Sequence, residues 1–405
     1  MSATIAASKP RTRHRLRQRR ERFLLVVTVL AVLAAWFYGY FTSSVELAPL
    51  VPQVLQGASR IQTRGELFIG FDPQGEIIGY AATGEAQGYS GPILVLVGID
   101  PAGEVTGVKL VNQRETPGFF RLVLNSDLLS QMPGKQVVEP FRIGEDLDAV
   151  TGATLSAEGL AASARQAIRQ VTAEGLDRQL PPEDQSIKFG IPEITLILLF
   201  AAGYFGHQLH HPAWKQRIRW ATLLAGMLVL GFVYTTPFTI TMVVSLLSGY
   251  WPDWHNNLYW YLLIGGILFV TTVNAKNPYC SWFCPFGAVQ ECLAAVTGAK
   301  LYRPRNYHIV LTWLQRGLAL VAVILGLALR RPGVIGYEPF ATLFDFQGAM
   351  IEWLFLVLIL FASLLILRPF CNYLCPLDPV VDLIAVTRKW AREVWQKWTQ
   401  RRAIT

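Results

Sequence analysis

The sequence predicts an α-helical membrane protein of about six transmembrane helices with an α+β domain inserted outside the membrane. Composition is the first observation, since 52% of the 405 residues are hydrophobic and 16% are charged, against about one quarter in soluble domains. Secondly, Lys and Arg gather in short stretches beside long apolar runs. Thirdly, residues 45–187 are glycine-rich and mixed in charge. The basic residues behind the net charge of +8 therefore indicate how the chain is oriented in the membrane, and no nucleic-acid partner is expected.

Residues 1–44 are predicted to form a basic cytoplasmic tail and a first membrane helix. Arginines crowd the stretch from Lys9 to Arg22 beside the single acid Glu21, and an uncharged run follows from Phe23 to Tyr40. Because basic residues favour the cytoplasmic side, the N-terminus is expected there. A cleaved signal peptide is the alternative, although its apolar core is shorter, about 7–15 residues, and FTSSVELAP is a poor cleavage site.

Residues 45–187 are predicted to fold as the extracytoplasmic α+β domain. The stretches IGFDPQGEIIGYAA and PILVLVGIDPAGEVTGVKLV contain short β-branched strands separated by Pro-x-Gly and Ala-Gly turns, a pattern typical of hairpins. An amphipathic helix is expected at about Ser156–Thr172. The polar linker RQLPPEDQS then returns the chain to the bilayer.

Residues 188–405 are predicted to form a five-helix membrane domain. Uncharged runs predict helices near Ile191–His207, Trp220–Thr236, Leu258–Asn274, Ile309–Ala328 and Trp353–Leu367. The basic clusters at 215–219, 300–305 and 388–402 then fall on the side of the N-terminus, with Arg330 and Arg331 as exceptions. Both termini are therefore expected in the cytoplasm.

The membrane domain repeats itself. The segments NPYCSWFCPFG (277–287) and RPFCNYLCPLD (368–378) each follow a predicted spanning helix, and each half also has a Pro-Phe turn upstream, TPFT at 236–239 and EPFA at 338–341. Two copies in the same orientation predict a parallel repeat about an axis along the membrane normal. The cysteines are thus expected to act as two matched pairs.

Four of the five cysteines form Cys-x3-Cys-Pro motifs on the cytoplasmic side, Cys280 with Cys284 and Cys371 with Cys375. This spacing puts both sulfurs of a pair on one helical face or around one tight turn. Two facing pairs supply four thiolates, the ligand count of a [2Fe–2S] or [4Fe–4S] cluster. Zinc has the same count but no redox role at a membrane boundary. Buried small hydrophobic residues are the remaining alternative, and Cys292 is expected to be of this kind.

The second candidate site is the segment DAVTGATLS, residues 148–156. Small residues here open the predicted amphipathic helix, so free amides at a helix N-terminus would face an anion such as a phosphate near Thr154. From the residues alone, the simpler interpretation is that Thr154 or Ser156 caps the helix.

Three segments of this domain resemble the FMN-binding domains of the Rnf and sodium-pumping NADH:quinone reductase G/C-type subunits. The segment from Asp148 to Thr154 resembles their flavinylation motif, in which FMN is esterified through its phosphate to the last threonine. The segments GYSGPI and ETPG resemble those that lie around the flavin. The resemblance implies covalent FMN on Thr154, attached by a flavin transferase, with contacts from Tyr89, Ser90, Gly91, Glu115, Thr116, Pro117, Gly118, Asp148, Thr151, Gly152 and Ala153.

The membrane half, with CSWFCPFG and RPFCNYLCPL, is similar to the polyferredoxin-like region of the NosR/NirI family of membrane flavoproteins. This resemblance implies an iron–sulfur cluster on Cys280, Cys284, Cys371 and Cys375. The family pattern normally continues into a cytoplasmic ferredoxin domain, which this sequence is expected to lack because no cysteine follows Cys375.

Together the resemblances imply electron transfer in the inner membrane of a bacterium. Electrons from a cytoplasmic or quinol donor would enter at the iron–sulfur centre and leave through FMN to an extracytoplasmic acceptor, and no catalytic acid, base or nucleophile is expected. Because the hydrocarbon core is about 30 Å thick, a quinone, a further cofactor or a partner subunit is needed unless the cluster or the domain is recessed. The alternatives are a membrane-anchored flavin redox sensor and an assembly scaffold for an external reductase.

Overall fold

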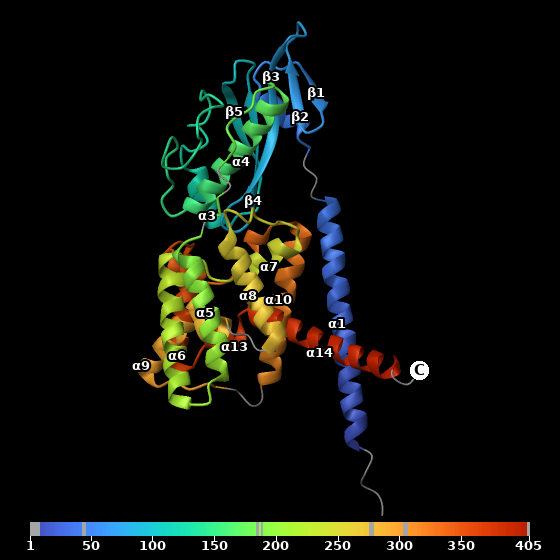
Figure 1. Cartoon of the computed structure of the whole chain (residues 1–405), viewed down its shortest axis with the longest axis vertical. Coiled ribbons are helices and arrows are strands. Elements are labelled where there is room, and N and C mark those ends of the chain that lie inside the picture. The colour runs from blue at the N-terminus through green and yellow to red at the C-terminus, as the bar shows by residue number, and fades with distance from the viewer. Residues whose placement is uncertain are drawn as a thin grey trace, which may run out of the picture.

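The computed structural model describes residues 9–42, 46–183, 186–187, 189–274, 279–302 and 307–402. A β-sheet domain stands at one end of a helical bundle, and the long helix α1 (Lys9–Thr42) runs along the bundle's side (Figure 1). Helix α14 (Leu377–Arg402) crosses α1, and Arg22 forms an ion pair of 3.4 Å with Glu393 there.

The sheet domain opens with the short helices η1 (Ala48–Leu50) and α2 (Val51–Val54). Five antiparallel strands then follow in the order of the sequence: β1 (Arg60–Arg64), β2 (Leu67–Phe71), β3 (Ile77–Gln87), β4 (Pro92–Ile99) and β5 (Val105–Gln113). The predicted turns join β2 to β3 and β4 to β5, where Gly75 and Gly103 have φ angles of +88° and +97°. In the second turn, Asp100 accepts hydrogen bonds from the amides of Gly103 and Glu104.

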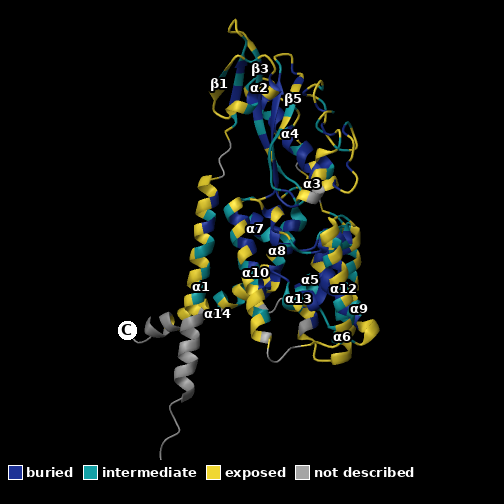
Figure 2. Cartoon of the chain, turned by 180° about the vertical axis from the view of Figure 1, so that it is seen from behind, coloured by how far each residue is buried: buried dark blue, intermediate teal, exposed yellow. Residues whose placement is uncertain are grey.

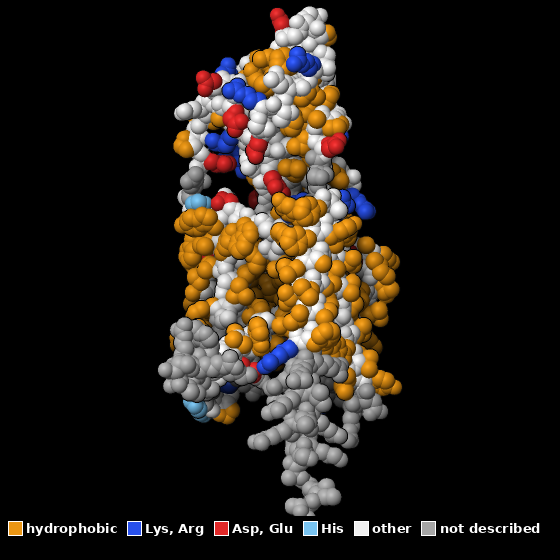
Figure 3. Space-filling model, turned by 90° about the vertical axis from the view of Figure 1, so that its right-hand side faces the viewer, with side chains coloured by type: hydrophobic (Ala, Val, Ile, Leu, Met, Phe, Trp, Pro, Cys, Tyr) orange, Lys and Arg blue, Asp and Glu red, His pale blue; other side chains and the backbone are white. Residues whose placement is uncertain are grey.

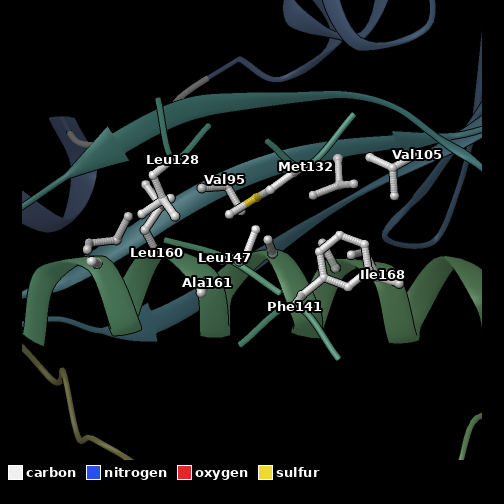
Figure 4. Close-up of a cluster of buried hydrophobic side chains, with 14 of the residues drawn as sticks. Val95, Val105, Leu128, Met132, Phe141, Leu147, Leu160, Ala161 and Ile168 are labelled. Carbon is white, nitrogen blue, oxygen red and sulfur yellow. The ribbon is translucent and has the colours of Figure 1, made fainter. Parts of the chain in front are cut away.

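Helix α4 (Thr154–Glu174) covers one face of the sheet, and α2 packs on the other. Figure 4 shows the first of these contacts, in which side chains of α4 meet the sheet and the segment after α3 (Pro117–Leu124) completes the cluster: Val95, Val105, Leu128, Met132, Phe141, Leu147, Leu160, Ala161 and Ile168. The predicted amphipathic helix is therefore confirmed, and it is longer at both ends.

The bundle contains a series of helices that differ widely in length: α5 (Ile191–Gln208), α6 (Pro212–Ala225), the π-helix η2 (Gly226–Val233), α7 (Ile240–Leu247), α8 (Leu258–Asn274), η3 (Tyr279–Phe283), α9 (Pro285–Thr297), α10 (His308–Leu329), η4 (Pro332–Val334), α11 (Phe340–Phe344), α12 (Met350–Leu365), α13 (Pro369–Tyr373) and α14. Each range predicted to span the membrane is largely helical. The number of crossings stays a prediction.

Among the described residues, length and hydropathy single out two helices that could cross a membrane. The stretches Arg22–Thr42 of α1 and Ile309–Leu329 of α10 have 21 residues each, with mean hydropathies of 2.1 and 1.9. Shorter apolar helices cover Ile191–Gly206, Leu258–Val273 and Met350–Leu365.

The surface divides by chemistry along the length of the molecule. Apolar side chains cover the bundle, whereas charged side chains gather over the sheet domain (Figure 3). Much of α1 and the outer faces of the bundle is exposed (Figure 2), including Leu30 at 59% and Phe41 at 74%. Because so large an apolar surface is unfavourable in water, the bundle is suited to a lipid environment.

Candidate cofactor sites

Thr154 is the first residue of α4 and follows what we call the attachment loop, residues 148–153. Gly152, with φ +79°, turns the chain into the helix, and Ala153 takes the N-cap position without a side-chain cap. The hydroxyl of Ser156 instead donates to Glu115 Oε2 at 2.6 Å. The interpretation of Thr154 or Ser156 as a helix cap is therefore wrong.

Glu115 ties helix α4 to the GYSGPI loop. Its Oε1 accepts hydrogen bonds from the amides of Ser90, at 2.9 Å, and Gly91, at 3.0 Å, while Ser156 binds Oε2. The side chain is buried, and burial raises the pKa of Glu115, whereas these hydrogen bonds act to lower it. The hydroxyls of Ser90 and Thr116 share a further hydrogen bond of 2.6 Å. The structure thus brings together the three segments that resemble flavin-binding segments.

The other predicted residues lie around this centre. Two hydrogen bonds join Asp148 and Gln131. The amide of Asp148 donates to Gln131 Oε1 at 2.9 Å, and Gln131 Nε2 donates to Asp148 Oδ2 at 3.0 Å. Thr151 is exposed, and Pro117 is the first residue of α3. Gly118 lies in α3, but its surroundings fall outside the described part of the chain.

The attachment loop faces the helical bundle. A Cβ on Gly152 would lie 2.8 Å from Nε2 of Gln347, which follows α11. The hydroxyl of Ser245, on α7, donates to the carbonyl of Ser90 at 3.1 Å. The segments that resemble flavin-binding segments therefore lie at the junction between the sheet domain and the bundle.

Tyr89 lies at the same junction. Burial raises the pKa of its phenol, and the carboxylates of Asp345, Glu115 and Glu338 raise it further. Since Asp345 and Glu338 flank α11 in the bundle, Tyr89 is surrounded by groups from both parts of the molecule.

Arg114 fastens the sheet domain to the bundle. Its guanidinium lies 4.1 Å from the ring centroid of Tyr250, and Arg330, at the end of α10, lies 5.0 Å from the same ring. The Arg114 carbonyl accepts a hydrogen bond of 3.3 Å from the amide of Gly333. Cation–π contacts of this kind stabilise by about 0.5–2 kcal/mol each.

The four predicted ligand cysteines line one cavity of about 30 Å³ inside the bundle. Its other walls are mostly apolar and aromatic: Phe286, Phe340, Phe370, Leu377 and Asp378. Cys280 lies in η3 and Cys371 in α13, while Cys284 and Cys375 end the turns that follow. Cys292 lies on α9 and is half-buried, and it is not among the lining residues.

The two cysteine motifs have the same local backbone geometry. The amide of Cys284 donates to the carbonyl of Tyr279 at 2.8 Å, and the amide of Cys375 donates to that of Phe370 at 2.9 Å. Each bond reaches back five residues and closes the turn around its pair of sulfurs. The sequence repeat is therefore also a structural repeat at this site.

The donor set fits an iron–sulfur cluster. Four thiols share the cavity, and Gln290 Nε2 donates to the sulfur of Cys371 at 3.3 Å. The buried Nη2 atom of Arg368 has no hydrogen-bond partner among the described residues, and an anionic cluster suits such a donor. Within the described part of the chain, no group of three or more His, Cys, Asp or Glu side chains is arranged to hold a single metal ion.

Family comparisons agree with both sites. Residues 88–169 match the FMN-binding domain, and residues 256–304 and 348–394 match the 4Fe-4S binding domain. Protein NirI of Paracoccus denitrificans is 29% identical over 202 residues, covering 45% of this chain and 29% of NirI. Regulatory protein NosR of Pseudomonas aeruginosa is 25% identical over 236 residues, covering 54% of this chain and 32% of NosR. The chain is therefore similar to FMN-binding iron–sulfur membrane proteins of the NosR/NirI type.

The chain aligns with about a third of the length of those two relatives. Its sheet domain is also similar to one component of the Na(+)-translocating ferredoxin:NAD(+) oxidoreductase complex of Acetobacterium woodii, with 28% identity over 113 residues, covering 26% of this chain and 54% of that component. The crystal structure of Shewanella oneidensis NqrC covers 27% of this chain and 64% of its own, at 21% identity, with a TM-score of only 0.22.

Two polar residues beside the cysteine site, Gln290 and Gln315, were not predicted from the sequence. Gln290 also accepts a hydrogen bond from the amide of Phe370, and Gln315 donates to the carbonyls of Cys371 and Cys375. A buried Gln in an apolar helix was the available signal, because such a side chain needs partners.

Proposed function

We propose that the chain carries electrons between an iron–sulfur cluster held by Cys280, Cys284, Cys371 and Cys375 and FMN attached to Thr154 through a phosphoester. The family matches support the two cofactors, and the positions of the two sites support their coupling. In this proposal the bundle crosses the bacterial inner membrane, both termini are cytoplasmic, and the sheet domain is periplasmic.

The observation that carries the proposal is the short segment that joins the two sites. Phe340 lines the cysteine cavity, and Gln347 contacts Gly152 in the attachment loop. Helix α11 rises about 1.5 Å per residue and the residues after it span at most about 3.6 Å each. The Cα atoms of Phe340 and Gln347 are therefore at most about 17 Å apart.

This separation is well below the roughly 30 Å of the hydrocarbon core. In this proposal the cysteine cavity is recessed toward the sheet domain, and a bridging quinone is not required. A cytoplasmic or quinol donor and an extracytoplasmic acceptor remain its expected partners.

The protein's own residues bind and orient in this scheme. When bound, the cluster and FMN supply the redox chemistry. The amides at the start of α4 would hold a phosphate ester at Thr154, and Glu115 holds the neighbouring loops in register with that helix. Phe286, Phe340 and Phe370 exclude water from the cysteine cavity.

The attachment is tested by intact mass and in-gel flavin fluorescence of full-length protein produced with a flavin transferase. We expect one covalent FMN in the wild type, none in Thr154→Val, and an unchanged level in Thr63→Val, which alters an exposed threonine of β1 outside the motif. Fluorescence that survives in Thr154→Val would disprove the attachment site. Iron and visible absorption are measured on the same samples, and a wild type without iron would disprove the cluster.

Electron transfer is tested in inverted vesicles, whose cytoplasmic face points outward. Dithionite added outside should reduce the enclosed flavin in the wild type and much more slowly in Cys280→Ser. The name of the NosR relatives, regulatory protein, supports redox sensing as a second candidate function. Equal rates of flavin reduction in the two proteins would favour that candidate.

A further inference from the structure

A partly buried charge network lies beside the cysteine cavity. Arg368 Nε lies 2.7 Å from Glu291 Oε1, and Arg219 of α6 binds the same oxygen. The side chains of Arg368 and Glu291 are 13% and 8% exposed, and that of Arg219 is 31% exposed. Two guanidiniums share one carboxylate, so the network carries a net charge of +1.

Arg368 connects the two cysteine motifs. It precedes α13, three residues before Cys371, with φ +53°, and its Nη1 donates to the carbonyl of Cys280 at 2.6 Å. Its guanidinium packs on Gly287, where a Cβ would lie 3.3 Å from Cζ. Three contacts thus fix the position of the positive charge.

The charge belongs to one half of the repeat only. Alignment of RPFC with NPYC pairs Arg368 with Asn277, which lies outside the described residues. Burying an arginine costs several kcal/mol unless the charge is compensated. Glu291 is shared with Arg219, so part of the compensation for Arg368 is left to the thiolate-bound cluster.

We propose that Arg368 raises the reduction potential of the cluster. The inference rests on the proposed function, because it requires a cluster on the four cysteines. Reduction adds one electron, taken from the donor, and no bond of Arg368 forms or breaks. A fixed positive charge favours the more negative, reduced state, and net charge near a cluster is one of the factors that set its potential. Glu291 opposes this effect.

The test is a potentiometric titration of the purified full-length protein, followed by EPR and visible absorption. Arg368→Gln should shift the ratio of oxidised to reduced cluster at least tenfold toward oxidised at a fixed potential, which is about 59 mV for one electron. Arg368→Lys keeps the charge and should stay close to the wild type. Glu291→Gln removes the opposing charge and should shift the ratio the other way. Arg217→Gln, an exposed arginine of α6, is the matched control and should have no effect.

Iron content separates failure of folding from failure of the inference. An unchanged potential in Arg368→Gln with full iron content overturns the inference, as does a shift of the same sign in Glu291→Gln. If Arg368→Gln loses its iron, Arg219→Gln replaces it, and this variant should shift the ratio toward oxidised by a smaller factor. An unchanged potential there also overturns the inference. A wild type without iron overturns the proposed function itself.

Discussion

Glu115 uses its two carboxyl oxygens for different partners. Oε1 accepts two backbone amides, whereas Oε2 faces a hydroxyl that is able to donate or accept. A protonated carboxyl fits these partners as well as an ionised one. Glutamine fits in the same way, because its amide nitrogen can donate to the Ser156 hydroxyl.

Replacing Glu115 by alanine should loosen the loops around Thr154. Two buried amides and a hydroxyl would lose their acceptor, and the expected loss is about 2–4 kcal/mol in the free energy of unfolding of the sheet domain. Hydrogen–deuterium exchange of the full chain should speed up at residues 88–92 and at the start of α4. Amides in Glu115→Gln should exchange almost as slowly as in the wild type. If Glu115→Ala exchanged at the wild-type rate, Glu115 would not hold these segments together.

The stability of the sheet domain should also depend on pH through Glu115. Because burial raises the pKa of this carboxyl, the folded state binds the proton more tightly than the unfolded state. Proton binding by Glu115 therefore stabilises the folded sheet domain. This contribution is complete below the carboxyl's pKa in the unfolded state, about 4.3, and is lost as pH rises through its pKa in the folded state. Thermal unfolding of the full chain across this range should show that decline in the wild type, and Glu115→Gln should lack it.

At the scale of elements, close packing of α4 on β3 depends on glycine. A Cβ on Gly84 would overlap the carbonyl oxygen of Ser163, and one on Gly159 would lie 2.7 Å from Cα of Gly88. The helix that begins at Thr154 is therefore held at a short distance from the sheet.

Gly84→Ala should push α4 away from β3. Overpacking of this kind costs about 1–3 kcal/mol, which we expect as a lower melting temperature of the sheet domain in full-length protein. Gly265→Ala is the control, because nothing lies within 4 Å of its added methyl group. A melting temperature unchanged in both variants would show that the contact relaxes freely.

Long periodic elements were predictable from the sequence, and short ones were not. Apolar runs gave the positions of α5, α8, α10 and α12, and the turn residues gave the hairpins. Helices α11 and α13 have five residues each, too few for a hydropathy window, and the change to a π-helix at Gly226 carries no local signal. Contacts such as Ser156 to Glu115, 41 residues apart, depend on the tertiary fold.

For the whole molecule, function depends on how the sheet domain rests on the bundle. Arg114, Ser90 and the attachment loop each contact a different segment of the bundle. Gly333, in η4, allows the closest approach, since a Cβ there would overlap the carbonyl of Glu115.

Gly333→Ala should therefore weaken the docking of the two parts without unfolding either. We expect slower flavin reduction from the cytoplasmic side and unchanged iron and FMN content, measured in the vesicle assay. Gly317→Ala on α10, with open space around the added methyl group, should behave like the wild type. Identical reduction rates in the two variants would contradict a role for docking.

The matched turns at Cys284 and Cys375 have a consequence for the evolution of this fold. One motif supplies two sulfurs, whereas a cluster takes four ligands, so an ancestor with a single half would have bound it only as a pair of identical chains. Gene duplication and fusion make the pairing permanent. The two halves are then free to diverge. The asparagine of one motif aligns in sequence with an arginine of the other, a difference that a symmetric dimer could not have acquired.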